Sequence, residues 1–199
     1  MLKNYVRIIQ LIIFSLLIGS SMSAFPQAML TKLGASFPMF NGNDLSAWVQ
    51  TGNASWQISG KEIIVNQGSG MLVSRLSIPD YIIEFDYWVS SNAQVTVYIR
   101  CTNPNVINVE TAYEVPLINQ ASGVGAGSIL MLSKAKATQV ANQWNHIQIS
   151  AIDRQISVTL NGVANQVVDT RFNAGSFAMS YQGGEFRLKN VNLTIPGRW

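Results

Sequence analysis

The stretch DYIIEFDYWVSSNAQVTVYIRC, residues 80–101, contains two runs in which apolar and polar side chains alternate. The apolar positions are Ile83, Phe85, Tyr87 and Val89 in the first run and Val95, Val97, Ile99 and Cys101 in the second. The positions between them include Glu84, Asp86, Trp88, Thr96, Tyr98 and Arg100. Because successive side chains of a strand point to opposite faces, each run has one apolar face for a core and one mixed face. A mixed face of acids, a base and aromatics is typical of a groove that holds a polar, ring-shaped ligand.

Short alternating runs of the same kind fill the chain after Phe25, and no long amphipathic helical pattern interrupts them. We expect strands at 56–59, 62–66, 71–74, 81–89, 94–101, 112–118, 128–132, 144–152, 155–161, 166–169, 176–181 and 186–195. Asn161-Gly162 is typical of a two-residue hairpin turn. The apolar pattern changes face between Leu188 and Val191, which predicts a β-bulge near Lys189-Asn190. Many short strands at this spacing predict a sandwich or jelly roll.

The first 24 residues are typical of an export signal. Lys3 and Arg7 precede an apolar run over 8–18, and small residues follow it. The run is shorter than the roughly 20 residues that a membrane span needs. We therefore expect a signal peptide over 1–24, a linker over 25–36, and no stable membrane span after cleavage. An uncleaved anchor helix is the alternative. The signal predicts a periplasmic or extracellular protein.

Composition excludes several classes of function. The formal net charge of +3 includes Lys3 and Arg7, so the chain after residue 24 carries a charge of about +1, and no basic stripe is present to bind nucleic acid. Cys101 is the only cysteine, so no internal disulfide can form. The alternation places its thiol on the apolar face of its strand, where we expect it to be buried and inert. A single His, at 146, and a single Cys also exclude a Cys/His zinc cluster.

A series of short sequence motifs along the chain resembles the motifs of one known family. They are FNGNDLSAW at 40–48, WQISG at 56–60, IIV at 63–65, the acidic strand at 81–88, the strand ending at Arg100, YEV at 113–115, WN at 144–145, LNG at 160–162, GG at 183–184 and FRLKNV at 186–191. Each phrase alone is weak, but their order is fairly specific. The chain resembles the 3-keto-disaccharide hydrolase domain over roughly Phe37 to Pro196.

The resemblance implies a fold and a substrate class. The fold is a concanavalin A-like jelly-roll sandwich of two antiparallel sheets over 37–196, here preceded by an N-terminal signal helix. The substrates are sugars already oxidised at carbon 3. A ketone at that carbon acidifies the hydrogen on carbon 2, so a modest base can remove it and the resulting enediolate can expel the group on carbon 1. Such a site needs a base and a positive group or metal at the developing oxyanion.

The positions that match the family's site are Glu84, Asp86, Arg100, Tyr113 and Glu114. We assign Glu114 as general base and Arg100 as the contact to the oxyanion or substrate carbonyl. Glu84 and Asp86 are expected to bind sugar hydroxyls or a divalent cation, whose presence the sequence leaves open. Tyr98, Tyr113 and Gln182 are further candidate substrate-binding residues, and Trp88 is a candidate stacking platform because it shares the acidic face. This assignment requires the side chains of three strands to meet in one hollow.

Two departures from the family pattern keep a second function open. Gln182 stands where a His often precedes the closing Gly-Gly, and Asn119 stands where an acid often follows the Tyr-Glu-Val strand. These amides favour a non-catalytic, lectin-like carbohydrate-binding module on the same fold. Glu84 and Asp86 lie about 7 Å apart by strand geometry, so a two-acid glycosidase also stays open. Another alternative is that both acids lie on a solvated outer sheet without a specific role. A separate alternative is that Arg100 only pairs with one of them. An envelope protein with an apolar interaction surface is the third possibility.

Overall fold

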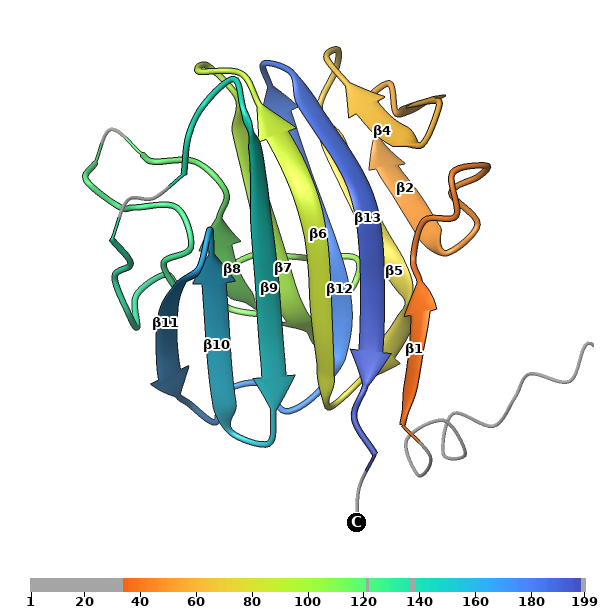
Figure 1. Cartoon of the computed structure of the whole chain (residues 1–199). Helices are drawn as coiled ribbons and strands as arrows, with labels where there is room; N and C mark the ends of the chain where they lie inside the picture. Colours follow the sequence, from red (N-terminus) through yellow and green to blue (C-terminus); the bar gives the residue numbers. More distant parts are fainter. Residues whose placement is uncertain (1–33, 121, 137–138, 198–199) are drawn as a thin grey trace, which may run out of the picture.

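The computed structural model describes residues 34–120, 122–136 and 139–197, so the signal helix expected within 1–24 and most of the expected linker lie outside the described residues. The described chain forms two antiparallel sheets that pack face to face (Figure 1). This architecture confirms the predicted jelly-roll sandwich. Within the described ranges, no helix is long and apolar enough to cross a membrane.

The larger sheet has eight strands in the order β11-β10-β9-β6-β13-β4-β3, and β1 also pairs with β13. Its strands are β1 (Ala35–Pro38), β3 (Gln57–Ser59), β4 (Glu62–Val65), β6 (Tyr81–Val89), β9 (Trp144–Ile152), β10 (Gln155–Leu160), β11 (Val163–Val168) and β13 (Phe186–Ile195). The β10–β11 hairpin turns at Asn161-Gly162, where both residues have positive φ, as the sequence predicted.

The smaller sheet has five strands in the order β2-β5-β12-β7-β8 and lies behind the larger sheet in Figure 1. Its strands are β2 (Trp48–Gly52), β5 (Gly70–Ile78), β7 (Gln94–Cys101), β8 (Tyr113–Pro116) and β12 (Gly175–Gly183). The sequence missed β1 and β2. It also predicted a strand at 128–132 that is absent, since this segment forms a turn closed by a single bridge between Ile129 and Ser133.

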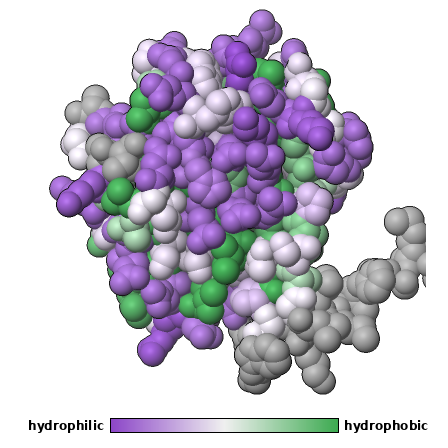
Figure 2. Space-filling view, in the orientation of Figure 1, coloured by the Kyte–Doolittle hydropathy of each residue, from purple (hydrophilic) through white to green (hydrophobic). Residues whose placement is uncertain are grey.

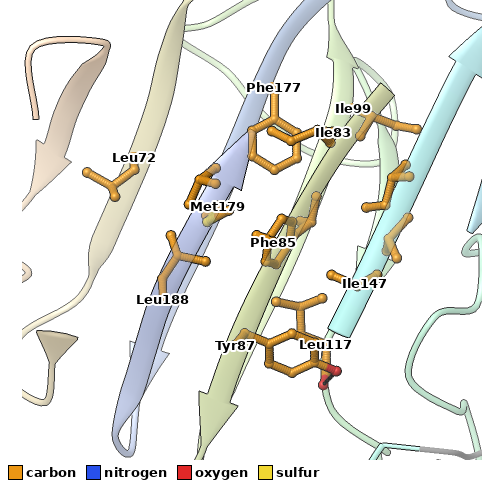
Figure 3. Close-up of a cluster of buried hydrophobic side chains, with 14 of the residues drawn as sticks. Leu72, Ile83, Phe85, Tyr87, Ile99, Leu117, Ile147, Phe177, Met179 and Leu188 are labelled. Atoms are coloured by element: carbon orange, nitrogen blue, oxygen red, sulfur yellow. Dashed lines mark hydrogen bonds between the residues drawn. The ribbon is translucent and has the colours of Figure 1, made fainter. Parts of the chain in front are cut away.

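The core fills the space between the two sheets. Phe85 of β6 contacts Tyr87 and, from the opposite sheet, Phe177 in a T-shaped arrangement with ring centroids 6.2 Å apart (Figure 3). The hydroxyl of Tyr87 donates a hydrogen bond to the carbonyl of Leu117, so its polar end is also satisfied in the core. Each such buried aromatic contributes roughly 2 to 3 kcal/mol to folding.

β6 and β7 are consecutive in the chain but belong to opposite sheets. The apolar faces predicted for both runs point inward, as the burial of Ile83, Phe85, Val95 and Val97 shows. Their mixed faces therefore point outward in opposite directions. Glu84, Asp86 and Trp88 lie outside the eight-stranded sheet, and Thr96 and Tyr98 lie outside the five-stranded sheet. The expectation that these two mixed faces line one groove is wrong.

Two β-bulges decide where neighbouring side chains point. The bulge predicted in the last strand is present, because the register of β13 against β6 shifts between Lys189 and Asn192, and Asn190 has a φ of 54°. A second, unpredicted bulge lies in β7, where Arg100 has a φ of 53° and the register against β12 shifts. This extra residue reverses the alternation at the end of β7, so Cys101 joins Tyr98 on the outer face instead of the core.

Candidate functional site

A polar hollow of about 350 Å³ opens on the outer face of the five-stranded sheet, over β7, β8 and β12. We call it the Glu114 hollow. Its polar lining residues are Gln94, Thr96, Tyr98, Glu114, Asn119, Gln120, Ser180 and Gln182. The alternation of each strand brings these residues to the same face: residues 94, 96 and 98 of β7 point outward together, as do 180 and 182 of β12.

Glu114 is the carboxylate of this hollow and lies on the edge strand β8. Its neighbours along the strand, Tyr113 and Val115, point into the core, so Glu114 points outward as the sequence parity predicted. The side chain is half-buried, and burial raises the pKa of its carboxyl group above the ordinary 4.5. No hydrogen bond to this carboxylate comes from any residue in the described ranges. Glu114 is therefore free to accept a proton from a ligand.

Tyr98 lies directly opposite Glu114 in the register between β7 and β8. Its ring packs against Val73 and Ala178 on the same outer face, so the ring supports the floor of the hollow. Burial is the main cause that raises the pKa of the Tyr98 hydroxyl to about 12, and the nearby charge of Glu114 adds to the effect. The hydroxyl thus stays protonated at neutral pH and can donate a hydrogen bond.

Thr96 and Ser180 extend the same row of polar groups, because they lie opposite each other on β7 and β12. Gln182 follows at a shift in the register between Tyr181 and Gly183. Gln182 is exposed and lines the same hollow. These hydroxyl and amide groups both donate and accept hydrogen bonds, as sugar hydroxyls require.

Asn119 and Gln120 hold the loop that borders the hollow. The Asn119 side chain accepts a hydrogen bond from the backbone N–H of Ala126 and donates one to the carbonyl of Gln139. Gln120 exchanges backbone hydrogen bonds with Gly123 and Val124. The glycine-rich segment 123–127 therefore lies beside the hollow.

The hollow combines one carboxylate with neutral polar groups. Its described lining includes no Lys, Arg or His. Across the described ranges, no group of three or more His, Cys, Asp and Glu side chains is placed to hold a metal ion. The hollow itself offers a cation only Glu114 and the amide and hydroxyl oxygens around it. The arrangement suits an uncharged polar ligand and one proton transfer to or from Glu114.

Arg100 does not share the hollow with Glu114. The bulge turns its side chain inward, where it is 1% exposed. Its guanidinium donates to the carbonyls of Pro79 and Phe172 and forms an ion pair of 3.3 Å with Asp80. A guanidinium committed to three partners inside the protein cannot contact a ligand of Glu114, so the expected pairing of Arg100 with Glu114 is wrong.

Tyr113 also lies outside the hollow. Its ring belongs to the core and contacts Phe172 with centroids 5.0 Å apart. Its hydroxyl donates to the Asp169 carboxylate at 2.7 Å and accepts from the backbone N–H of Phe172. These contacts anchor the segment between β11 and β12, so Tyr113 has a structural position and the prediction that it binds substrate beside Glu114 is wrong.

Glu84, Asp86 and Trp88 lie on the far side of the molecule, on the outer face of the eight-stranded sheet. Figure 2, which looks onto this sheet, shows a mainly hydrophilic surface there. The Asp86 carboxylate lies 2.8 Å from Nδ1 of His146 and accepts a hydrogen bond from Asn190. Glu84 accepts one from Gln148. The structure therefore does not bring them to the Glu114 hollow, which contradicts the predicted single site.

Trp88 is also engaged within this outer face. The guanidinium of Arg187 lies 5.0 Å from the centre of its ring, and the ammonium of Lys189 lies 3.7 Å from that of Trp144. These cation–π contacts hold Trp88 and Trp144 against neighbouring side chains of the same sheet face, so both rings have a structural role there.

Four polar residues of the hollow were not singled out from the sequence: Gln94, Thr96, Gln120 and Ser180. The alternation that selected Tyr98 also placed residues 94 and 96 on its face, so a signal was present for them. The sequence contained no such signal for Ser180 and Gln120, because their positions depend on how β12 and the loop after β8 pair with β7.

The sequence model of the 3-keto-alpha-glucoside-1,2-lyase-like domain family matches residues 36–194. The chain belongs to this family. The matched range agrees with the resemblance drawn from the phrases over Phe37 to Pro196. No curated protein matches the chain at a significant level.

Solved structures share the fold at low sequence identity. A putative glycosyl hydrolase from Parabacteroides distasonis aligns with a TM-score of 0.68 at 17% identity, over 79% of this chain and 92% of that one. The carbohydrate-binding module CBM66 from Bacillus subtilis aligns with a TM-score of 0.55 at 14% identity, over 73% and 93%. The exoplasmic domain of VIP36, solved with Ca²⁺ and Man3GlcNAc, aligns with a TM-score of 0.55 at 7% identity, over 82% and 89%. These likenesses establish the sandwich.

Proposed function

We propose that the protein binds 3-keto-glycosides in the Glu114 hollow and cleaves them by elimination, with Glu114 as the base. The observation that carries this proposal is the half-buried carboxylate of Glu114, whose pKa is raised and which no described residue hydrogen-bonds, in a hollow lined by hydroxyls and amides. Family membership supports the substrate class.

The groups of the hollow supply a base and hydrogen-bond donors for this chemistry. The Glu114 carboxylate takes the proton from carbon 2, and the C–H electron pair forms the enediolate with the carbon 3 oxygen. On collapse the carbon 3 carbonyl re-forms, a double bond forms between carbons 1 and 2, and the bond from carbon 1 to the aglycone oxygen breaks. Glu114 returns its proton to that oxygen, so the aglycone leaves as an alcohol. A positioned base of this kind accelerates proton transfer by roughly 10² to 10⁴-fold.

Neutral donors take the place of a cation at the enediolate oxygen. Tyr98 keeps its proton at neutral pH, and the Gln182 amide carries two N–H donors at the rim. Preorganised neutral donors stabilise an oxyanion less than a guanidinium does but still contribute to the rate. Both residues stay candidates for this role.

The decisive experiment follows aglycone release from an aryl 3-keto-glucoside by the purified protein. We expect release by the wild type and a loss of at least about 100-fold in Glu114→Gln. Glu84→Gln is the matched control, because it makes the same change on the outer face of the opposite sheet and should retain full activity. Equal rates in wild type and Glu114→Gln would reject the mechanism. A parallel assay with a chelator tests whether release needs a divalent cation.

A second candidate function is non-catalytic carbohydrate binding. The observation that favours it is the lining of the hollow, where amides stand at Gln182 and Asn119 and no described lining residue is cationic. Saturable sugar binding without aglycone release, lost on Gln182→Ala and retained in Glu84→Gln, would identify the protein as a binding module.

We further propose that the protein acts outside the cytoplasm after removal of residues 1–24. The basic, apolar and small-residue order of this segment supports export. Fractionation of producing cells and the mass of the mature chain test it: the expected form begins near Phe25 in the exported fraction, and a cytoplasmic full-length chain would contradict it.

A further inference from the structure

A second hollow lies on the same outer face of the five-stranded sheet, at the side of β2 and β5. Its volume is about 390 Å³, and its lining includes Val49, Thr51, Val73, Arg75 and Pro104. We call it the Val49 hollow. Its lining combines apolar side chains at Val49, Val73 and Pro104 with hydroxyls and the cationic Arg75, whereas the described lining of the Glu114 hollow is mainly hydroxyls and amides and includes no cationic side chain. The one sheet face therefore offers two sites of different chemistry.

The strand register connects the two hollows. Ser180, which lines the Glu114 hollow, lies opposite Met71 on β5, and Met71 lies opposite Thr51 on β2, which lines the Val49 hollow. Only Met71 separates the two hollows in this row. Because adjacent strands are about 4.8 Å apart, Ser180 and Thr51 are about 10 Å apart. A substituent on a sugar in the first hollow can cross this distance and enter the second.

The segment between β7 and β8 packs on the sheet face beside both hollows. Ile107 packs against the outer-face cluster of Val73, Tyr98 and Ala178. Pro104, earlier in the same segment, forms a wall of the Val49 hollow. The cluster that supports Tyr98 in the first hollow thus continues into the wall of the second.

Arg75 gives the Val49 hollow its charge. Its Nε donates a hydrogen bond to the carbonyl of Ser46 at 3.0 Å. Within the described ranges, no acidic side chain forms an ion pair with this guanidinium. Its other N–H groups donate to no carboxylate in the described ranges, so they can bind an anionic partner. The charge is opposite to that of Glu114 at the other end of the face.

We propose that the Val49 hollow is the aglycone subsite for a glycoside whose sugar occupies the Glu114 hollow. The aglycone it takes is an aromatic group that carries a negative charge. The aromatic ring contacts Val49, Met71 and Val73, and the anion faces Arg75. This inference rests on the proposed function of the Glu114 hollow and names the substrate class for it.

The test measures the dissociation constants of four 3-keto C-glucosides by titration calorimetry. Their carbon 1 substituents are methyl, phenyl, 4-carboxyphenyl and the methyl ester of 4-carboxyphenyl. A carbon–carbon bond to the aglycone cannot be expelled as an alcohol, so the wild-type protein binds these probes without consuming them. We expect the phenyl probe to bind about tenfold more tightly than the methyl probe, from the apolar area it buries. The carboxylate should bind about threefold more tightly than its ester, as a partly exposed ion pair allows.

Two matched pairs of variants locate the effects. Val49→Gln should erase most of the phenyl preference, whereas Val163→Gln should not, because Val163 is similarly exposed (38% against 39%) but lies on the edge strand of the other sheet. Arg75→Gln should erase the preference for the carboxylate, and Arg154→Gln, in a different hollow, should keep it. Thermal unfolding of each variant verifies the fold.

The outcomes separate the inference from the function on which it rests. If all four probes bind equally and Glu114→Gln alters their binding, the sugar site stands and the aglycone subsite is overturned. If none binds, both proposals fail. Preferences that persist in both Val49→Gln and Arg75→Gln would place the aglycone elsewhere and also overturn the inference.

Discussion

Tyr98 and Glu114 face each other across β7 and β8 on the outer side of the five-stranded sheet. The carboxylate contributes to the raised pKa of the phenol, and the carboxyl group's own pKa is raised by burial. Burial is the main cause of both shifts. At neutral pH the pair therefore presents one proton acceptor beside one proton donor.

Activity should fall in acid through the titration of Glu114. A base works only when it is deprotonated, and burial raises the pKa of Glu114 above 4.5. We therefore expect the acid limb of kcat/KM for a 3-keto-glucoside to have its midpoint above pH 4.5, with activity rising as the pH rises through it. Rate measurements between pH 4 and 8 test this. An acid limb that is unchanged in the residual activity of Glu114→Gln would assign the titration to another group.

The same pKa shift predicts a cost in stability. A carboxyl group whose pKa is higher in the folded state stabilises the fold below its ordinary pKa, and this contribution is lost as the pH rises through the raised value. Glu114→Gln removes the half-buried charge, so this variant should melt at a higher temperature than the wild type at pH 7. The difference should shrink as the pH falls below 4.5. Calorimetric scans at the two pH values measure it, and a less stable variant at pH 7 would contradict the prediction.

Tyr98→Phe separates the hydroxyl of Tyr98 from its ring. The ring packs against Val73 and Ala178 and remains in the variant, so the free energy of unfolding should change by less than about 1 kcal/mol. The lost hydroxyl removes one hydrogen bond to the ligand, which is worth about 1 kcal/mol or roughly fivefold in affinity. Titration of a 3-keto C-glucoside against both proteins measures the change. Unaltered affinity and unaltered turnover would exclude the hydroxyl from the site.

Arg100 and Asp80 form a buried ion pair, so removing one partner should destabilise the protein. Arg100→Ala removes the guanidinium that pairs with Asp80 and donates to the carbonyls of Pro79 and Phe172. We expect a loss of about 3 to 5 kcal/mol in the free energy of unfolding, measured by denaturant titration. Below the transition, the folded fraction should release aglycone at the wild-type rate. A folded variant with abolished turnover would restore Arg100 to a role in the reaction.

The strands of this protein were largely readable from the sequence. β6, β9 and β13 follow the period-2 alternation, and the inward position of Tyr113 and outward position of Glu114 follow from the same rule. The bulge at Lys189-Asn190 was visible because two apolar series of opposite parity meet there. The bulge at Arg100 was not, because an arginine with positive φ carries no compositional sign of its backbone conformation.

The candidate site was harder to predict because alternation does not say which sheet a strand joins. Glu84 and Tyr98 both lie on the outward faces of their strands. However, β6 and β7 belong to opposite sheets, so these two faces point in opposite directions. Of the predicted site residues, only Glu114, Tyr98 and Gln182 meet in the hollow, where Asn119, noted in the sequence as a departure from the family pattern, joins them. Ser180 joins them through the pairing of β12 with β7, a contact between segments about 80 residues apart in the chain.

Gly184 should be intolerant of a side chain, because it shapes the turn that follows Gln182. It has a φ of 78°, and a Cβ there would lie 2.4 Å from the Cα of Ala93 and 2.7 Å from its N. Gly184→Ala should therefore lower the free energy of unfolding by more than the roughly 1 to 2 kcal/mol that a positive φ alone costs an L-residue. Gly60→Ala is the matched control, since Gly60 has a φ of 62° and no atom within 4 Å of the added Cβ. Denaturant titration of both variants gives the difference, and equal losses would show that Ala93 moves aside without cost.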